Sequence, residues 1–561
     1  MKKRIAVLLL SVMMLVTLAS CARPYVDDYF IAFLKNDQDK KNELDYLLNE
    51  QNFEPHRVDL EAKEHDGIQL IFVETQYATD LYLRGWIGVD YADGAWYSGR
   101  SSTDRQTIGA LDIYRDLYEM NEFPSDRMFY DFYSLLHPQM EIFDPDYDFL
   151  TKYKKFDEFG FIATSVHLRH VNSESTRVYL PAVFDQSRGL RDYGSDQPSE
   201  HSFVNFFDGM LTGRDFAKNG VKYSAVTFAP TKGNAQWIDT LSADIAEYNL
   251  QKELIFAFNS YTADNSSDQE DQSFCSIKVE RDTPAKDLTT VSYRKSGREL
   301  TSFVHKSEDV NYSSWDKQVI LKSGSGAEYV IEYDSSYRVK SVRGDNNESL
   351  FHTYCAASLA QREEINRILF EDPGTEFSYT QYVYDIYTAK SDSQIIADLA
   401  REIYEQDYDA SAYDFSCAAL TNAAFLDAAK QRNDLVYAVI DYITDDLGCK
   451  YTKTPALGRV DEGLDGVENF LTVTKEGYSE QYASAVALIL REYGIPTRYV
   501  EGYLAHDFDI NRFSNAVGRF STYVHDYNAH AWVEVFFDGI GWVQYECTPG
   551  TFEIMKEGIG E

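Results

Sequence analysis

The stretch GYSEQYASAVALILREYGIPTRYVEGYL, residues 477–504, decides how the C-terminal part of this chain folds. From Ser479 to Tyr493 its apolar residues recur at helical spacing, which predicts a buried helix. Gly494 is a natural C-terminal cap, and the proline two residues later forbids continuation. A strand over 497–504 is expected to follow, and Ser479 lies in the first turn of the helix.

The segments around this helix predict a mixed unit. Apolar residues at i, i+3, i+4 and i+7 predict helices in 393–408, 412–431 and 435–448, so a helix-rich unit begins near residue 347. The last 65 residues alternate in polarity and contain VFFDGIGWV (535–543), which indicates a β-hairpin.

The preceding part of the chain reads differently. Between residues 54 and 345, short aromatic or β-branched segments broken by turn signals predict a β-rich region, which forms either one domain or two subdomains. A helical insert is expected near 106–120. The Asp/Tyr-rich stretch 143–161 could form a sugar-binding aromatic face, although such aromatic residues more often belong to a core. Residues 22–53 are expected to be a spacer.

The N-terminus indicates export. A basic start, a short apolar run and the sequence Leu-Ala-Ser-Cys, ending at Cys21, resemble a bacterial lipoprotein signal over residues 1–21. Cys21 would then carry the lipid, and the body would be extracytoplasmic and held to the membrane by its lipid anchor. An uncleaved membrane anchor is the alternative.

Composition limits the function classes. The chain has 561 residues, of which 44% are hydrophobic, and this content suits several globular cores. With Lys+Arg 53 and Asp+Glu 91 the net charge is −38, so phosphates would be repelled and no nucleic-acid partner is expected. No metal site or cofactor is expected, since the later cysteines lack metal-ligand spacing, while one disulfide stays open. These cysteines are Cys275, Cys355, Cys417, Cys449 and Cys547.

Three motifs together resemble one family. Residues 477–504, then NAHAWVEV (528–535) and GWVQYECTPG (541–550), are similar in order, spacing and flanking residues to the bacterial transglutaminase-like superfamily, which has a papain-like core. The resemblance covers about 437–550. A weaker one, in YLRGWIGVDYADGAWYS (82–98), is to the extracytoplasmic segment before this core in membrane-bound members.

The resemblance implies an α+β fold, in which an N-terminal β-rich ectodomain is followed by a papain-like transglutaminase-like domain over 346–561, with helices packed on an antiparallel sheet. It puts Ser479 at the nucleophile position, His530 at the general base and Glu546 at the residue that orients the imidazole. Tyr478 and Trp532 are substrate-cleft candidates. Serine replaces the usual cysteine, and glutamate replaces the commoner aspartate.

Serine at the nucleophile position leaves several interpretations open. A helix N-terminus and an imidazolium can bring a thiol to thiolate near neutral pH, but they cannot ionise a hydroxyl. Ser479 is therefore the mark of a retired site, a weak nucleophile that needs His530 to take its proton, a helix N-cap, or a change particular to this chain. Cys547 is a further thiol, but strand alternation points it away from Glu546.

The hairpin makes a geometric prediction. An even-numbered loop would put His530 and Glu546 on opposite faces of the sheet, so a three-residue loop over 538–540, closed by Phe537 and Gly541, is expected. That register brings a carboxylate oxygen of Glu546 within about 2.6–3.2 Å of one His530 ring nitrogen, with Ser479 near the other.

Two function classes follow. In the first, the chain is an enzyme that acts on glutaminyl or peptide amides by acyl transfer or hydrolysis, weak or inactive because of the serine. In the second, it is a non-catalytic module that binds a peptide, a protein or an envelope polymer at the cell surface.

Overall fold

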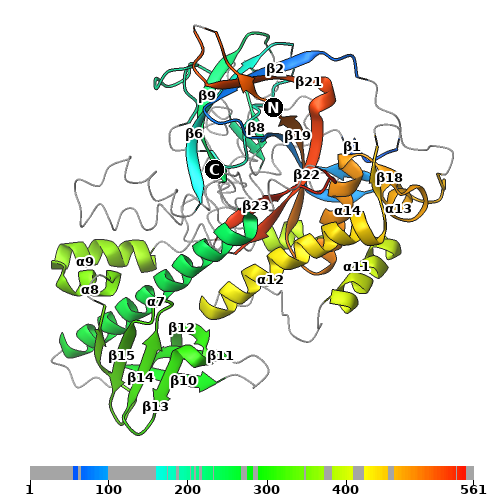
Figure 1. Cartoon of the computed structure of the whole chain (residues 1–561). Coiled ribbons are helices and arrows are strands. Elements are labelled where there is room, and N and C mark those ends of the chain that lie inside the picture. The colour runs from blue at the N-terminus through cyan, green and yellow to red at the C-terminus, as the bar shows by residue number, and fades with distance from the viewer. Residues whose placement is uncertain are drawn as a thin grey trace, which may run out of the picture.

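A computed structural model describes most of the chain between residues 55 and 550 (Figure 1). The described ranges are 55–60, 65–98, 160–371, 382–407, 422–452 and 460–550, with short gaps at 173–174, 185–188, 202–203, 208–209, 214–215, 217, 231–232, 267–273, 282–287, 347–348, 514 and 539. The signal segment with Cys21, the helical insert at 106–120, nearly all of 143–161 and Cys417 lie outside them.

A four-stranded antiparallel sheet forms the centre of the molecule. Its strand order is β23 (Gly541–Tyr545), β22 (Ala529–Phe537), β19 (Thr497–Ala505) and β3 (Leu81–Gly88). The helix α14 (Ser479–Glu492) packs against β22 and β19, as Figure 1 shows. The predicted fold class, helices on an antiparallel sheet after a β-rich region, is confirmed.

The helix α14 is buried because its apolar residues surround most of its circumference. Ala483, Val486, Ala487 and Leu490, the predicted stripe, are all fully buried. Gly494 has φ +73°, and its amide donates to the carbonyl of Arg491 at 2.9 Å, as a C-terminal glycine does.

The remaining helices of this unit lie around α14 and the sheet. The helix α12 packs beside α14, and α11 also contacts α14. Their bounds, with those of the short elements nearby, are α11 (Gln394–Asp407), α12 (Asn422–Asp441), η6 (Tyr442–Asp446), β17 (Lys450–Tyr451), α13 (Gly466–Asn469), η8 (Phe470–Thr474), β18 (Glu476–Gly477) and η9 (Asp526–Asn528).

The strand β3 joins the N-terminal region to the C-terminal one. It pairs with β19 across more than 400 residues of sequence, and both of its faces are buried. Leu81 and Leu83 enter one core, while Tyr82 and Trp86 enter the core that contains α14. The sheets therefore cross the boundary that the sequence suggested near residue 345.

A five-stranded antiparallel sheet lies beside this centre and also mixes the two regions. Its order is β20 (Asp509–Ile510), β21 (Phe520–His525), β2 (Gln69–Thr75), β6 (Phe161–His170) and β9 (Lys222–Pro230). Small paired strands accompany the two sheets: β1 (His56–Arg57), β4 (Asp90–Ala92), β5 (Ala95–Tyr97), β7 (Val204–Phe207) and β8 (Met210–Thr212).

A second unit with its own hydrophobic core occupies 275–371. It has two antiparallel sheets with orders β10-β11-β12 and β13-β14-β15-β16, and Figure 1 shows it below the rest of the molecule. Its elements are β10 (Cys275–Arg281), β11 (Leu288–Lys295), β12 (Arg298–Lys306), η4 (Ser307–Asp309), β13 (Val310–Ser313), β14 (Gln318–Lys322), β15 (Glu328–Tyr333), β16 (Val339–Gly344), α8 (Leu350–Ala356), α9 (Leu359–Asn366) and η5 (Arg367–Glu371).

The sequence did not predict α7 (Asn234–Ser266), a helix of 33 residues that connects these units. Trp237 and Leu241, near its start, enter the core around α14, whereas Leu250 and Leu254 enter the core of the second unit. Figure 1 shows the helix running from β23 toward the second unit. Because its two halves bury different faces against different partners, no single apolar stripe marks it in the sequence.

Candidate active site

Ser479 is the first residue of α14 and does not cap it. Tyr478 is the N-cap residue, and its amide donates to Oε1 of Gln481 at 2.7 Å. The interpretation of Ser479 as a helix cap is therefore wrong. Ser479 nevertheless lies at the positive end of a helix dipole, where developing negative charge on its oxygen is favoured.

The Ser479 hydroxyl instead contacts the strand β22. Its Oγ accepts a hydrogen bond from the amide of Ala531 at 3.2 Å, and the side chain is almost fully buried. The β22–β23 ladder ends at the pair Val533 and Tyr545, so Ala531 lies where β23 has already ended. The hydroxyl thus takes the ladder position that β23 leaves, next to His530.

The hairpin has the predicted register. Phe537 pairs with Gly541, and the amide of Ile540 donates to the carbonyl of Phe537 at 3.0 Å, which gives a three-residue loop. Gly541 has φ +104°, a conformation that residues with a Cβ rarely adopt. The odd loop puts His530 and Glu546 on the same face of the sheet.

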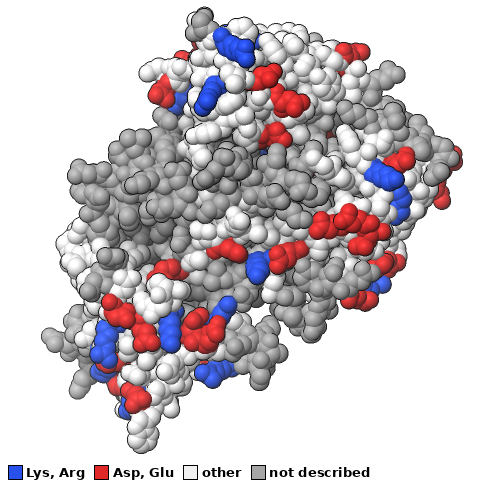
Figure 2. Space-filling view, viewed as in Figure 1, with Lys and Arg blue, Asp and Glu red and all other residues white. Residues whose placement is uncertain are grey.

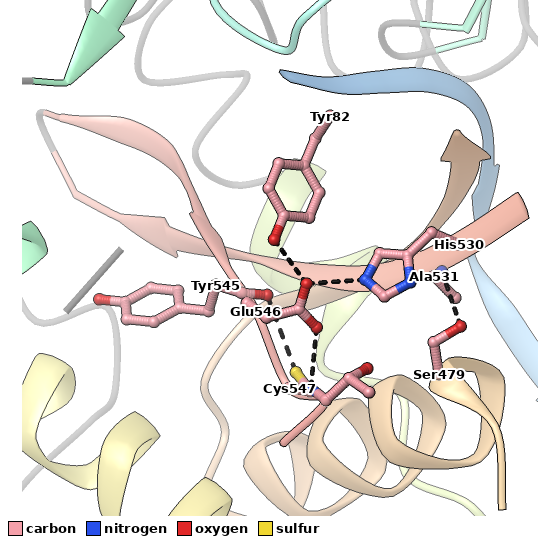
Figure 3. A network of polar contacts seen from close by, with 8 residues as sticks. Tyr82, Ser479, His530, Ala531, Tyr545, Glu546 and Cys547 are labelled. Atoms are coloured by element: carbon pink, nitrogen blue, oxygen red, sulfur yellow. Dashed lines mark hydrogen bonds and ion pairs between the residues drawn. The ribbon is translucent and has the colours of Figure 1, made fainter. Parts of the chain in front are cut away.

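His530 and Glu546 are in contact, as predicted. Their Nε2 and Oε2 atoms lie 2.7 Å apart, and Figure 3 shows the two side chains pointing toward each other across the end of the sheet. The His530 side chain is 9% exposed and that of Glu546 is fully buried. An ionised Glu546 holds the proton on Nε2, so Nδ1 is left as the basic nitrogen.

Glu546 accepts two further hydrogen bonds. The Tyr82 hydroxyl donates to Oε2 at 2.5 Å, and the Thr548 amide donates to Oε1 at 2.8 Å. Burial raises the pKa of Glu546, but the charge and hydrogen bond of His530, together with these donors, outweigh it and leave the pKa lowered. The carboxylate is therefore ionised at neutral pH.

Tyr82 is a site residue that no sequence motif predicted. It opens the segment that resembles the region before the core in membrane-bound relatives, but no local pattern connects it with Glu546, 464 residues away. Its ring packs against the rings of His530 and Trp532, with centroids 5.8 and 5.3 Å away.

The two cleft candidates are both buried. Trp532 is fully buried, and its ring centroid lies 6.4 Å from that of His530. Tyr478 is 8% exposed. Neither candidate ring is therefore open to solvent in this structure.

A buried ion pair fixes β22 behind the site. Glu534 lies opposite Arg498 in the ladder with β19, and Arg498 Nε and Nη2 lie 2.7 and 2.5 Å from its Oε2. Arg84 of β3 adds a third contact at 3.4 Å. Burial raises the pKa of Glu534, but the two guanidinium groups lower it overall, so the carboxylate stays charged and holds three strands together.

Cys547 does not replace Ser479 as a nucleophile. Its side chain is fully buried, and burial raises the pKa of its thiol well above the ordinary value. Cys355 and Cys449 are free thiols as well.

An apolar cavity of about 120 Å³ lies next to Tyr82. Its walls come from β3, β9, the start of α7 and the hairpin β22–β23, and include Leu81, Phe228, Trp237, Ile540 and Trp542. Within the described ranges, no group of three or more His, Cys, Asp or Glu side chains could hold a metal ion, and no helix is long and apolar enough to cross a membrane. In Figure 2 acidic and basic side chains are interspersed over the visible face.

Comparison with known proteins identifies the domain around this site. Residues 421–547 match the transglutaminase-like superfamily. An uncharacterized protein of Bacillus subtilis, YebA, is 40% identical over 118 residues, which are 21% of this chain and 15% of YebA. A protein-glutamine gamma-glutamyltransferase of Pseudomonas aeruginosa is 35% identical over 132 residues, which are 24% of this chain and 18% of that enzyme.

The segments aligned with YebA and with the Pseudomonas aeruginosa enzyme each span less than a fifth of that relative's length. Among solved structures, the periplasmic domain of TgpA from Pseudomonas aeruginosa aligns over 86% of this chain and 88% of that domain, with 12% identity and a TM-score of 0.36. The same domain bound to ethylmercury aligns over 86% and 90%, with 12% identity and a TM-score of 0.35. The chain carries a bacterial transglutaminase-like domain, as the sequence motifs indicated.

Proposed function

We propose that this chain is an extracytoplasmic transglutaminase-like protein of the bacterial cell surface that binds amide-bearing peptides but has lost fast acyl transfer. The observation that carries the proposal is the Ser479 hydroxyl at the start of α14, beside a His530–Glu546 pair that keeps its hydrogen bond. The base and its carboxylate are in place, and a hydroxyl occupies the position at which this architecture uses a thiol.

Acyl transfer at this site would need a proton transfer that a thiolate avoids. As the Ser479 oxygen bonds to the amide carbon, its proton would pass to Nδ1 of His530, and Glu546 would stabilise the imidazolium. Breakage of the C–N bond would release the amine with that proton, and water or a second amine would then attack the ester.

The energetic difficulty lies in the first of these steps. The helix dipole contributes only about 0.3–1 kcal/mol, which is too little to ionise a hydroxyl in the ground state. The whole gain must then come from alignment of the hydroxyl with Nδ1. Because Ser479 Oγ already accepts the Ala531 amide, its position is set by the strand and not by the imidazole.

An acyl-transfer assay on the full chain tests this proposal. Native protein, Ser479→Cys and Ser479→Ala are incubated with a glutaminyl peptide and a small fluorescent amine. We expect label transfer with Ser479→Cys, and equal background with the native protein and Ser479→Ala. Native activity well above that of Ser479→Ala would establish Ser479 as a working nucleophile and contradict the loss of catalysis.

A second candidate function, a binding module without chemistry, is favoured by the cavity next to Tyr82. Its apolar walls suit one side chain of a bound peptide. Ala182 lines the cavity, and Ala182→Trp would fill it. Loss of peptide binding in this variant, with unchanged reactivity of a thiol at position 479, would separate binding from the chemical site.

The cellular location rests on the N-terminal sequence, in which a short apolar run precedes Cys21. We expect inhibition of lipoprotein processing to accumulate a precursor and Cys21→Ser to release or mislocalise the protein. Unchanged size and membrane retention of Cys21→Ser would instead identify an uncleaved anchor.

A further inference from the structure

We propose that Tyr82, on a strand outside the matched transglutaminase-like segment, is a positioning residue. Its hydroxyl fixes the Glu546 carboxylate and weakens the electrostatic attraction between this carboxylate and His530. This inference rests on the proposed function of the His530–Glu546 pair, which it deepens. Tyr82 contacts no reacting atom and acts through Glu546.

Tyr82 and His530 both donate to the same oxygen of Glu546. The Tyr82 hydroxyl lies 2.5 Å from Oε2 of Glu546, and Nε2 of His530 lies 2.7 Å from the same atom, while Oε1 receives the Thr548 amide. Figure 3 shows the phenol and the imidazole reaching this oxygen from different directions. Three donors thus fix both oxygens and leave the carboxylate little freedom to rotate.

The strand β3 is held where this contact requires it. Leu504 of β19 pairs with Tyr82, and Gly502 pairs with both Arg84 and His530. A Cβ on Gly502 would lie 2.0 Å from the carbonyl oxygen of Leu83, so only glycine lets the two strands approach this closely. A residue from the N-terminal region therefore completes a site whose other parts lie between 479 and 548.

Tyr82 remains a neutral donor at all working pH values. Burial raises its pKa well above the ordinary value, and the neighbouring Glu546 raises it further. A neutral hydroxyl that donates to a carboxylate stabilises the anion, so less of the anionic charge is available to hold the His530 proton. The phenol should therefore weaken the hold of Glu546 on the His530 proton, compared with a Glu–His pair that lacks this third donor.

Other titratable groups lie near the His530–Glu546 pair and interact with it electrostatically. Burial raises the pKa of Asp80, which is close enough to feel Glu546 and lies near His506. The negative charge of Glu546 also raises the pKa of Tyr451 and of Cys547. None of these groups donates a hydrogen bond to Glu546 in the contacts described, so removal of the Tyr82 hydroxyl isolates one interaction.

The test is an NMR titration of His530 in the full chain, with histidine labelled at Cε1. The His530 resonance is identified by its absence in His530→Gln. Tyr82→Phe keeps the ring contacts and removes only the hydroxyl. We expect the pKa of His530 to rise by about half a unit to one unit, as loss of a hydrogen bond to a charged group would produce. Incorporation of 3,5-difluorotyrosine at position 82, a stronger donor, should lower it.

Tyr293→Phe is the matched control, because Tyr293 also donates to a buried glutamate, Glu253, in the other core. This variant should leave the His530 titration unchanged. An unchanged titration in both position-82 variants would overturn the inference and make Tyr82 a packing residue. The readout uses the native serine, so it stands even if a thiol at position 479 shows no activation and the proposed function fails.

Discussion

Two His–Glu–Tyr networks in the described part of the chain are built around a fully buried glutamate side chain, and their comparison shows what makes one of them a candidate site. In the central unit Glu546 joins His530 and Tyr82. In the core of the second unit, Glu253 of α7 joins His305 and Tyr293, at 2.7 and 3.0 Å. Both glutamates are fully buried, and both histidine side chains are nearly so.

The difference lies in what stands beyond the histidine. At His530, the adjacent Ala531 amide holds Ser479 at the start of a 14-residue helix, where the β22–β23 ladder has ended. At His305, the paired residue Thr289 shares a hydrogen bond with Ser307 at 2.9 Å, and Ser307 begins the 3-10 helix η4, which has three residues. A His–Glu–Tyr network therefore stabilises a core by itself, and becomes a candidate active site beside the N-terminus of a long helix.

Glu253→Ala should produce the largest loss of stability. Removal of the carboxylate leaves His305 and Tyr293 buried without it, at a cost of about 3–5 kcal/mol in the free energy of unfolding. Chemical denaturation measures this loss. In the Ser479→Cys background the alkylation rate of the introduced thiol should not change; a parallel loss of reactivity would show that the two networks are coupled.

Glu546→Gln, also in the Ser479→Cys background, tests the Glu546 network in the same way. Without the anion the imidazolium loses its partner, so the pKa of the thiol should rise and its alkylation at neutral pH should slow, by at most about tenfold for a rise of one pKa unit. Iodoacetamide kinetics measure the change. If the rate stays the same, Glu546 is only a structural carboxylate, like Glu253.

Glu501 provides a smaller, pH-dependent effect. Burial raises its pKa, but His56, whose Nδ1 lies 2.5 Å from Oε2, and the Tyr499 hydroxyl bring the pKa down to about 2. A lowered carboxyl pKa contributes stability that is present above the unfolded value of about 4.3 and is lost as pH falls toward 2, about 3 kcal/mol here.

Acid unfolding curves test this contribution. Glu501→Gln should flatten the loss of stability between about pH 4 and pH 2, the window set by the unfolded and folded pKa values. Glu328→Gln, which removes an exposed partner of Lys322, is the control and should leave the curve unchanged. Identical curves for Glu501→Gln and the native protein would refute the assigned shift.

The smallest expected effect concerns the two hairpin glycines. Gly541 has φ +104° and Gly297, in the β11–β12 turn, has φ +79°. Alanine at either position should cost about 1 kcal/mol of stability. Gly541→Ala should also slow alkylation of a thiol at position 479, since the loop sets the register of Glu546, whereas Gly297→Ala should not. Equal reactivity of the thiol in both variants would show that the 538–540 loop does not position Glu546 for the chemistry at position 479.

Local sequence patterns predicted the parts of the site that follow each other closely in the chain. The helix at Ser479, the three-residue loop and the His530–Glu546 contact depend on spacing within about seventy residues, where helical periodicity and strand alternation apply. The contribution of Tyr82 depends on β3 pairing with β19, and no local pattern specifies which distant strand a strand will pair with.

The same reasoning explains the other differences between prediction and structure. The helix α7 lacks a single apolar stripe because its halves belong to two cores, and Ser479 was a reasonable cap by residue type alone. The Glu253–His305 network is invisible in sequence because 52 residues separate the partners and no motif surrounds them.

The central claim is that position 479 lies beside an intact imidazole–carboxylate pair that lacks only its thiol. The most direct test is the pH dependence of iodoacetamide alkylation in full-length Ser479→Cys, compared with His530→Ala in the same background. The account predicts a thiol pKa well below the ordinary value of about 8.5, restored toward that value by loss of His530. A thiol that titrates near 8.5 with His530 present, and reacts no faster than a free thiol, would contradict it.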